Sequence, residues 1–261
     1  MSQLLTRERQ ALIRDRLQDE GRVLAGELAK FFSVSEDTIR RDLREMAAAG
    51  LCERVYGGAL RAAPQHGSLS HRQSVAADEK AMLAGAAAPL LKRGATVVID
   101  AGSTNLAIAA RISQGHRLTI VTNAPAIATA AGDRGADTIL LGGRYDAATG
   151  GCLGARTAAE AAQLRPDLYV LGACGVDPAA GVTAFSQEEA ELKRLLVGRS
   201  RAVLVAATAD KLGTAASFGV ADCDRLTHLV VGADCPAELA QAFSSRGVAV
   251  TQAGPQRRGA S

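Results

Sequence analysis

Hydroxyl, amide and charged side chains stand directly after several short apolar segments between residues 96 and 211. The first segment runs into Asp100-Ala-Gly-Ser-Thr-Asn105, in which Ser103 and Thr104 supply hydroxyl groups and Gly102 permits close approach of the backbone. A helix that starts there adds free backbone N–H groups, and this combination suits a phosphate. A helix cap is the competing interpretation, because serine and threonine are also favoured cap residues.

The residues that follow the later segments extend this set. Two lysines complete it: Lys211 lies in the turn 208–211, and Lys193 lies in the stretch EEAELKRLL, where an exposed helix lysine is the simpler interpretation. Hydroxyls, amides, glycines, an acid and lysines on one rim suit a small, polyhydroxylated, phosphorylated ligand. The complete candidate set is Asp100, Gly102, Ser103, Thr104, Asn105, Thr122, Asn123, Gly142, Gly143, Asp177, Lys193 and Lys211.

Apolar segments that alternate with helical stretches must position these side chains. Strands are predicted at 96–100, 118–122, 138–142, 168–172, 202–206, 228–232 and 248–251, and helices at 79–92, 104–112, 124–131, 187–199 and 237–245. Continuous apolar strands alternating with helices indicate a Rossmann-like α/β domain with a parallel sheet covered on both faces. Ligands of such sheets bind beyond the carboxyl ends of the strands, where the candidate residues stand.

The N-terminal region has a different pattern, with three predicted helices at 6–19, 24–32 and 35–49. Leu12, Ile13 and Leu17 form an apolar stripe on the first helix, and the second offers Val23, Leu24, Leu28 and Phe31. Ser35 is a natural N-cap for the third helix after a short break. Two helices, a tight turn and a third helix predict a helix-turn-helix domain.

The third helix has one apolar and one polar side. Ile39, Leu43 and Met46 form its buried stripe, because they lie close together at the helical period. Arginine reads guanine edges or phosphates, and threonine reads base edges or backbone, so the opposite side is suited to the major groove. A solvated basic face is the alternative. Residues 50–58 follow as a short strand pair, or wing. The candidate DNA-binding residues are Ser35, Asp37, Thr38, Arg40, Arg41, Arg44, Tyr56 and Gly57.

Composition excludes several other classes of protein. The net charge of the 261 residues is +3, and residues 1–63 carry 11 Lys and Arg against 10 Asp and Glu, so DNA binding must rest on where the charges lie. The five cysteines form no CxxC pair and the four histidines are dispersed, which disfavours a metal site or a disulfide framework. We expect no cofactor. Neither a membrane-spanning run nor a signal peptide is present, so we expect a cytoplasmic protein without a membrane partner.

Changes in composition divide the chain into four parts. Residues 1–62 form the predicted helix-turn-helix domain. Residues 63–73 are small and polar and are expected to be a linker. Residues 74–253 form the α/β domain, and residues 254–261 are expected to be a disordered tail.

Both parts of the chain resemble one family. The N-terminal part closely resembles the helix-turn-helix signature of the DeoR family of bacterial transcriptional regulators. The resemblance lies in SVSEDTIRRDLREM, the following glycine and ERVYGGAL. Six further segments resemble landmarks of that family's effector-sensing domain, which is similar in fold to ribose-5-phosphate isomerase. They are DAGSTN, VTN, LLGGRYDAATGGCLGA, GVDPAAGVT, EEAELK and ADKLG. The resemblance implies that Ser103 and Thr104 hold phosphate and that the two lysines supply positive charge. It also implies that Thr122, Asn123 and Asp177 meet hydroxyl groups.

Three residues depart from the pattern usual in the family. Tyr56 stands where histidine is usual, Asn105 stands where a second threonine is common, and Thr208 stands where an aspartate usually precedes the lysine by three residues. The last two alter the polarity of the candidate ligand site, so the resemblance does not identify the effector.

The resemblance implies a transcriptional regulator, most often a repressor, whose affinity for double-stranded operator DNA responds to a phosphorylated sugar or related metabolite. We expect a homo-oligomer, either dimer or tetramer, because one helix-turn-helix unit reads only a half-site. An alternative is an isomerase-like enzyme with an accessory DNA-binding domain, but residues 175–181 contain a single carboxylate, Asp177, and Glu188, Glu189 and Glu191 are interpreted as a solvated face. A third hypothesis is a constitutive DNA-binding protein whose large domain only oligomerises.

Overall fold

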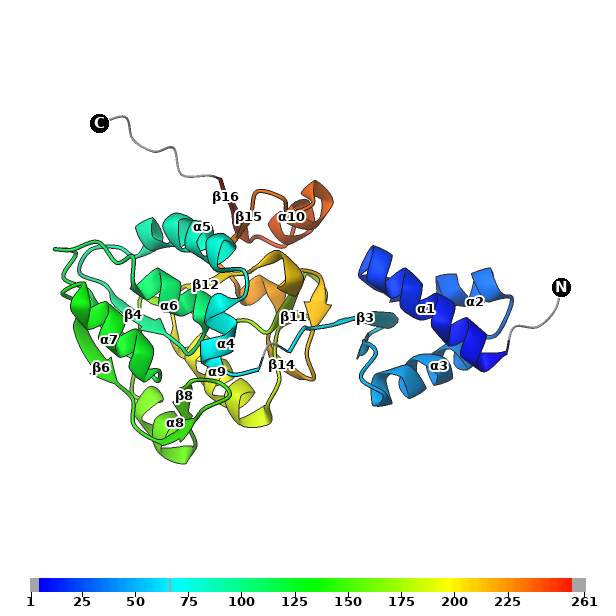
Figure 1. The fold of residues 1–261 in the computed structure, drawn as a ribbon, viewed down its shortest axis with the longest axis horizontal. Coiled ribbons are helices and arrows are strands. Elements are labelled where there is room, and N and C mark those ends of the chain that lie inside the picture. Colours follow the sequence, from blue (N-terminus) through cyan, green and yellow to red (C-terminus); the bar gives the residue numbers. More distant parts are fainter. Residues whose placement is uncertain (1–4, 66, 255–261) are drawn as a thin grey trace.

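The computed structural model describes residues 5–65 and 67–254. The N-terminal helices lie to one side of a larger α/β domain, and strand β3 runs from the first to the second (Figure 1). The expected tail falls almost wholly on residues 255–261, which lie outside the described residues. No helix in the described ranges is long and apolar enough to cross a membrane.

The N-terminal domain contains the three predicted helices and a small antiparallel sheet. The helices are α1 (Thr6–Glu20), α2 (Ala25–Phe32) and α3 (Glu36–Ala48), and the strands are β1 (Arg22–Leu24), β2 (Glu53–Val55) and β3 (Gly58–Ala62). Helix α3 begins where the Ser35 hydroxyl accepts a hydrogen bond from the backbone N–H of Thr38, at 3.2 Å. Ile13, Leu28, Ile39 and Leu43 pack into one buried core, which confirms the predicted helix-turn-helix fold.

The apolar stripes of the first two helices differ from expectation at three residues. Leu12 and Phe31 are exposed by 45% and 66%, and Leu24 belongs to β1 rather than to the second helix. The physical reason is that β1 pairs with β3, with Val23 opposite Ala59. This pairing fixes the rotation of α2 and directs Leu28, in place of Phe31, into the core.

A seven-stranded sheet forms the centre of the α/β domain. Its order is β16 (Ala249–Ala253), β15 (His228–Gly232), β12 (Val203–Ala206), β9 (Leu168–Val170), β4 (Thr96–Ile99), β5 (Thr119–Thr122) and β6 (Asp137–Leu140). Every neighbouring pair is parallel. All seven predicted strands are therefore confirmed, and their carboxyl ends share one edge of the sheet.

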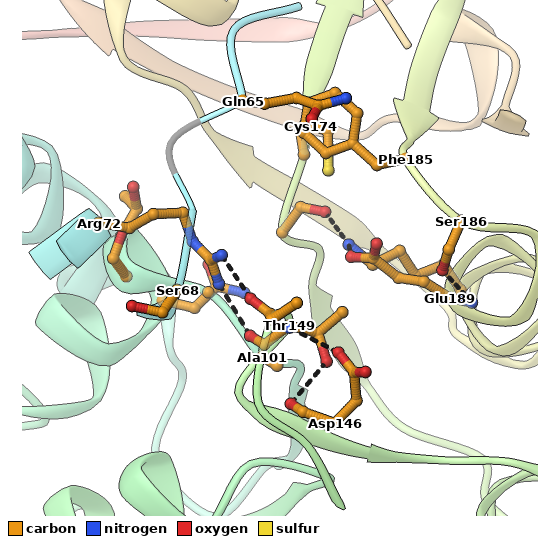
Figure 2. A pocket seen from close by; sticks show the side chains of 18 of the residues that line it. Gln65, Ser68, Arg72, Ala101, Asp146, Thr149, Cys174, Phe185, Ser186 and Glu189 are labelled. Atoms are coloured by element: carbon orange, nitrogen blue, oxygen red, sulfur yellow. Dashed lines mark hydrogen bonds and ion pairs between the residues drawn. The ribbon is translucent and has the colours of Figure 1, made fainter. Parts of the chain in front are cut away.

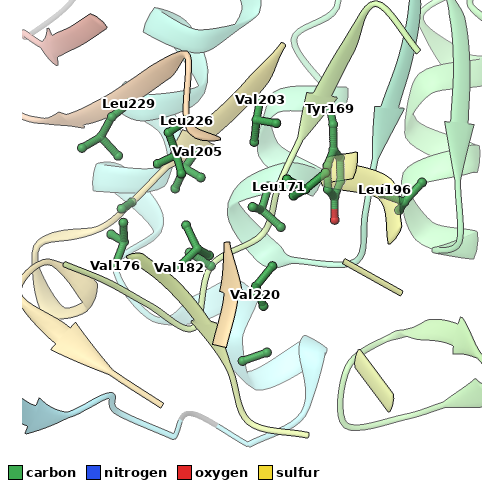
Figure 3. Close-up of a cluster of buried hydrophobic side chains, with 14 of the residues drawn as sticks. Tyr169, Leu171, Val176, Val182, Leu196, Val203, Val205, Val220, Leu226 and Leu229 are labelled. Carbon is green, nitrogen blue, oxygen red and sulfur yellow. The ribbon is translucent and has the colours of Figure 1, made fainter. Parts of the chain in front are cut away.

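Two apolar cores explain why the strands are apolar throughout. Alternate residues of a strand face opposite sides, so Val97 and Ile99 pack beneath α5 (Ala77–Ala87), α6 (Ser103–Ala109) and α7 (Pro125–Asp133). Val98 and Tyr169 face the other core, which contains Leu196 of α9 (Gln187–Arg199) and Phe243 of α10 (Ala237–Ser244). Figure 3 shows this second core around Tyr169, Val203 and Leu229.

Several short elements were not expected from the sequence. They include the helices α4 (Leu69–Ser74) and α8 (Ala155–Ala161), the 3-10 turns Ala88–Leu90, Ala209–Lys211 and Cys223–Arg225, and the hairpin β7 (Arg144–Asp146) and β8 (Gly151–Leu153). A small sheet joins β10 (Gly175–Asp177), β11 (Gly181–Ala184) and β14 (Phe218–Ala221), and β13 (Thr214–Ala215) pairs in parallel with β3. Helix α4 lies, except for its last residue, within the stretch 63–73 that was expected to be a linker.

Candidate functional site

A cavity of about 660 Å³ lies beyond the carboxyl ends of the central strands β4, β9 and β12. Residues 101–105 follow β4, residues 172–174 follow β9, and Ala206 ends β12. Further parts of the wall are formed by the hairpin residues 146–149 and by Pro64, Gln65, Gly67, Ser68 and Arg72, as the labels in Figure 2 show for Gln65, Arg72 and Thr149. The cavity therefore stands where ligands of parallel sheets bind.

Six of the predicted ligand-binding residues line this cavity. They are Gly102, Ser103, Thr104, Asn105, Lys193 and Lys211. The first four belong to the turn between β4 and α6, and the lysines come from α9 and from the 3-10 turn Ala209–Lys211. The fold thus brings together residues that are more than 100 positions apart in the sequence.

Thr104 is the most informative of these residues. Its side chain is 5% exposed, and its hydroxyl Oγ1 has no hydrogen-bond partner within the described part of the chain. A buried hydroxyl without a partner costs about 1–3 kcal/mol. A ligand oxygen in the cavity would remove that cost.

Lys193 belongs to a buried ionic network behind the cavity. Its Nζ lies 2.7 Å from Glu189 Oε1 and 3.5 Å from Asp100 Oδ2, and it donates to the carbonyl of Gly172. Burial by itself lowers the pKa of Lys193, but Asp100 and Glu189 together raise it above its usual value. Lys193 is therefore a charged lysine that two carboxylates neutralise, and Glu189 is buried rather than part of a solvated face.

The same network fixes the turn that carries the hydroxyl groups. Asp100 accepts hydrogen bonds from the Tyr169 hydroxyl at 2.7 Å and from the Gly172 backbone N–H at 2.7 Å. Asn105 Nδ2 donates to Asp100 Oδ1 at 2.8 Å and to the carbonyl of Val170 at 3.0 Å. The asparagine that departs from the family pattern therefore ties α6 to β4 and β9.

Arg72 and Lys211 carry positive charge into the cavity, and the hydrogen bonds of both side chains run to backbone carbonyls. Arg72 donates to the carbonyls of Ala148 and Thr149 at 2.6 and 2.8 Å, and Lys211 donates to the carbonyl of Ala173 at 2.9 Å. None of the ion pairs formed within residues 5–65 and 67–254 includes either side chain. Burial lowers the pKa of Lys211, and Lys193 and Arg72 lower it further, while Cys174 and Asp210 oppose this effect.

The carboxylates that line the cavity already have partners of their own. Glu188 pairs with Arg144 at 2.6 Å, and Glu189 pairs with Lys193. Asp146 accepts from the backbone N–H of Thr149 at 2.7 Å. Arg72 and Lys211 therefore stay outside the ion pairs of the described residues, and each can receive an anion in the cavity.

Six predicted ligand-binding residues do not line the cavity. Asp100 and Asn123 lie behind it, where Asn123 Oδ1 accepts from the backbone N–H of Ala101 at 3.1 Å. Thr122 is fully buried and accepts from the Ala124 backbone N–H, and Asp177 accepts from those of Ala179 and Ala180. Gly142 and Gly143 pack against α8, where the Thr157 hydroxyl donates to the carbonyl of Gly142. Each of these groups positions backbone, and the contact with ligand expected for it stays a prediction.

Arg72 and the segment around it were missed by the sequence analysis. Pro64, Gln65, Gly67, Ser68 and Arg72 all line the cavity, although their small and polar character predicted a linker. A charged residue in such a stretch was the available signal. Its partners lie 76 and 77 residues away, so local sequence does not reveal them.

The predicted DNA-reading side of α3 is exposed. Arg40 pairs with Glu36 and Asp37 at 2.5 and 3.1 Å, and Arg41 pairs with Glu45 at 3.3 Å. Arg44 is exposed and takes part in none of the ion pairs within the described ranges. These pairs are solvent-exposed, so phosphates can displace the carboxylates at little cost.

The remaining DNA-binding candidates lie at the ends of two elements. Ser35 caps α3, and its hydroxyl lies 2.9 Å from that of Thr38. Tyr56 and Gly57 form the tip of the β2–β3 hairpin, where Tyr56 is fully exposed and Gly57 has a φ of +82°. That φ lies in the left-handed region, which favours glycine. The hairpin therefore has the form of a wing.

A buried ion pair that the sequence analysis missed holds α3 against α1. Arg9 Nε lies 2.5 Å from Asp42 Oδ2, and Arg9 Nη2 lies 3.0 Å from Asp42 Oδ1. Both side chains are buried. This bidentate contact fixes the orientation of α3 relative to the rest of the domain.

The described residues contain neither a group of side chains arranged to bind a metal ion nor a disulfide bond. Within residues 5–65 and 67–254, no three His, Cys, Asp or Glu side chains are grouped to hold a metal ion. All five cysteines are free.

Comparison with known proteins agrees with this architecture. Residues 9–65 match the DeoR-like helix-turn-helix domain, and residues 75–233 match the DeoR C terminal sensor domain. The chain therefore belongs to the DeoR family of transcriptional regulators, which bind DNA and are not enzymes.

Curated relatives span nearly the whole chain. The glycerol-3-phosphate regulon repressor of Escherichia coli (strain K12) is 30% identical over 87% of this chain and 91% of its own length. The uncharacterized HTH-type transcriptional regulator FruR of Bacillus subtilis (strain 168) is 31% identical over 86% of this chain and 91% of its own. Among solved structures, ribose 5-phosphate isomerase A from Methanocaldococcus jannaschii is 15% identical and overlaps 52% of this chain and 54% of its own, with a TM-score of 0.38.

Proposed function

We propose that this protein is a repressor of a sugar or carbohydrate catabolic operon in the cytoplasm. Its affinity for operator DNA is controlled by a phosphorylated sugar or related metabolite that binds in the cavity at the carboxyl ends of the strands. Ser103, Thr104 and Lys211 contact the phosphate. The protein acts as a homo-oligomer, because two half-sites require two reading helices.

The hydrogen bonding of two cations in the cavity is the observation that carries this proposal. Arg72 and Lys211 donate to backbone carbonyls and form none of the ion pairs of the described residues, whereas Glu188 and Glu189 pair with Arg144 and Lys193. Thr104 adds a buried hydroxyl without a partner. An anionic oxygen would satisfy that hydroxyl and pair with both cations, and charge-assisted hydrogen bonds are about twice as strong as neutral ones.

The names of relatives support the same class of ligand. One relative is the glycerol-3-phosphate regulon repressor, and another is the transcriptional repressor AccR of Agrobacterium fabrum, which is 31% identical over 79% of this chain. A phosphate ester and repression are thus associated with similar chains. The volume of about 660 Å³ accommodates a small sugar phosphate.

Fluorescence anisotropy of the protein on DNA from upstream of its own gene and the neighbouring operon tests the proposal. The panel contains inorganic phosphate, glycerol 3-phosphate, ribose 5-phosphate and fructose 1-phosphate, together with the unphosphorylated parent compounds. A phosphate ester should change operator affinity by about 5- to 150-fold, while its parent compound has no effect. Tight DNA binding that no phosphate ester alters would leave a constitutive DNA-binding protein and overturn the effector assignment.

A Ser103→Ala variant provides the control for the site. It should bind the operator as the wild type does and respond weakly to the active phosphate ester. A normal response would remove Ser103 from the proposed phosphate site.

A further inference from the structure

The segment that joins the two domains is also a wall of the cavity. Strand β3 ends at Ala62, and the chain then passes through Pro64, Gln65, Gly67 and Ser68, all of which line the cavity, before it enters α4. A ligand in the cavity therefore lies against the chain that leads directly out of the wing.

Arg72 holds this segment in place. Its guanidinium donates to the carbonyls of Ala148 and Thr149 in the β7–β8 hairpin and to that of Gly67 at 2.6 Å (Figure 2). The carbonyl of Arg72 in turn accepts from Lys80, a buried lysine of α5. The segment is thus fixed to the sensor domain through neutral acceptors, and an anion competes with these for the same guanidinium.

A second connection runs from the cavity to the same strand. Lys211 is followed by β13, whose Thr214 and Ala215 pair with Arg61 and Ala62 of β3. Thr214 Oγ1 donates to the carbonyl of Lys211 at 2.9 Å, and Ala63 N–H donates to the carbonyl of Ala215 at 2.7 Å. Lys211 lies three residues before Thr214 of β13, and Arg72 lies ten residues after the end of β3, so both cations connect the cavity to β3.

We propose that Arg72 binds the anionic group of the effector and thereby couples the cavity to the DNA-binding domain. This inference rests on the proposed function and adds a residue and a route to it. In the free protein Arg72 holds residues 67–72 to the β7–β8 hairpin. In the complex the guanidinium turns to the phosphate, the bonds to Ala148 and Thr149 are released, and β3 changes its position against β13. The effector favours this second arrangement because it forms a charge-assisted contact there that the first arrangement lacks.

Hydrogen exchange measured by mass spectrometry on the full chain tests this route, with the same four phosphate compounds as probes. In the wild type, an active probe should slow exchange at residues 101–105 and change exchange at residues 58–62 and 67–74. Protection at 101–105 without any change at 58–62 or 67–74 would overturn the coupling and leave the phosphate site standing. No change at either place with any probe would overturn both proposals.

Arg72→Gln separates binding from coupling, and Arg156→Gln is its matched control. Arg156 is an exposed arginine of α8 that pairs with Glu160 and does not line the cavity. The measurement is made at probe concentrations that saturate protection at 101–105. In Arg72→Gln the probe should then change operator affinity by less than about 2-fold, whereas in Arg156→Gln it should change operator affinity by about 5- to 150-fold, as in the wild type. A full shift in Arg72→Gln would overturn the inference.

Arg72→Lys keeps the test valid if Arg72→Gln does not fold. Lysine retains the charge but lacks the planar fork that spans two carbonyls. This variant should bind the active probe more weakly than the wild type and show a reduced shift in operator affinity at saturation. A wild-type shift in this variant would count against the role of Arg72.

Discussion

Thr104 and Lys211 are the two residues on which, at the scale of single residues, the proposed binding of an anion in the cavity depends. Thr104 offers a buried hydroxyl without a partner in the described part of the chain, and Lys211 offers an ammonium group that donates to the carbonyl of Ala173. Both groups are less favourable in the free protein than they would be beside an anion. Part of the free energy of the proposed binding therefore comes from removing the unfavourable free energy of the unpartnered hydroxyl and of the buried ammonium group.

Thr104→Val tests this at the hydroxyl. Valine has nearly the same shape and removes the unpartnered oxygen, so the free energy of unfolding without ligand should stay the same or rise by about 1 kcal/mol. Affinity for the active phosphate ester should fall about 10-fold or more, because a hydrogen bond to a charged group is worth about 1.5–3 kcal/mol. Urea unfolding and isothermal titration calorimetry measure the two quantities.

Thr129→Val is the matched control for that variant. Thr129 is exposed on α7, and its hydroxyl donates to the carbonyl of Pro125. Its replacement should leave ligand affinity unchanged. Equal losses of affinity in the two variants, or none in Thr104→Val, would contradict the role of the Thr104 hydroxyl.

The pH dependence of ligand binding tests Lys211. The pKa of Lys211 lies below the ordinary value of 10.5 because of burial and the neighbouring cations. A bound anion favours the charged lysine and raises this pKa, so affinity is greatest below the pKa of the free protein and falls as pH rises through it. Calorimetry from pH 7.5 to 10 should show this alkaline loss of affinity. In Lys211→Arg the loss should disappear, because arginine stays charged over that range.

Helix α3 is the element that we propose reads DNA, and its position depends on contacts made by its buried side. Asp42 on that side forms the bidentate pair with Arg9 of α1. The exposed side carries Arg40, Arg41 and Arg44. Substitutions on the two sides of α3 are therefore expected to cause different kinds of defect.

Substitution on the exposed side should affect DNA binding alone. Arg41→Ala should weaken operator binding by at least about 30-fold, since each of two half-sites loses a contact worth about 1–3 kcal/mol. Phosphate-ester affinity and the midpoint of thermal unfolding should not change. Arg156→Ala, which removes an exposed arginine of α8 with the same spacing to its partner, is the control. Unchanged operator affinity in Arg41→Ala would contradict the assignment of α3.

Substitution on the buried side should affect stability first. Asp42→Asn leaves the Arg9 guanidinium buried without its counter-charge, and breaking a buried pair in this way costs about 3–5 kcal/mol. Urea unfolding of the full chain should show this loss in the transition of the N-terminal domain. Asp37→Asn, at an exposed position on the same helix, should change stability by less than about 1 kcal/mol.

The whole molecule adds the requirement that two reading helices match the spacing of two half-sites. One helix-turn-helix domain buries too little surface for tight specific binding, so we expect self-association to supply the second. Inserting about five base pairs between the half-sites rotates one of them by half a helical turn. Operator affinity measured by anisotropy should then fall toward the value for non-specific DNA. Undiminished affinity would show that each subunit binds alone.

The sequence predicted the arrangement of elements because local patterns carry that information. Apolar runs bounded by turn residues located all seven strands of the parallel sheet, and the spacing of Ile39, Leu43 and Met46 located the buried side of α3. Residues directly after β4 reached the cavity as expected, because the end of a parallel strand has one place in such a sheet.

The partners of polar side chains were not available from local patterns. Glu189 appeared to belong to a solvated face, yet it is buried against Lys193, since the rotation of α9 follows from its packing on the second core. Asp177 follows an apolar segment as the ligand-binding residues do, but β10 turns into a separate small sheet and directs it to its own backbone.

What the sequence by itself determined is therefore the family, the two domains, the exposed polar side of α3 and the place of residues 102–104 at the end of a strand. Only the tertiary structure decided which cations of the cavity stay outside ion pairs and that the stretch expected to be a linker is a wall of the cavity. The physical reason is the distance along the sequence over which the interactions act. Strand and helix patterns depend on neighbours within a few residues, whereas the hydrogen bonds of Arg72 to Ala148 and Thr149 exist only once distant segments have packed together.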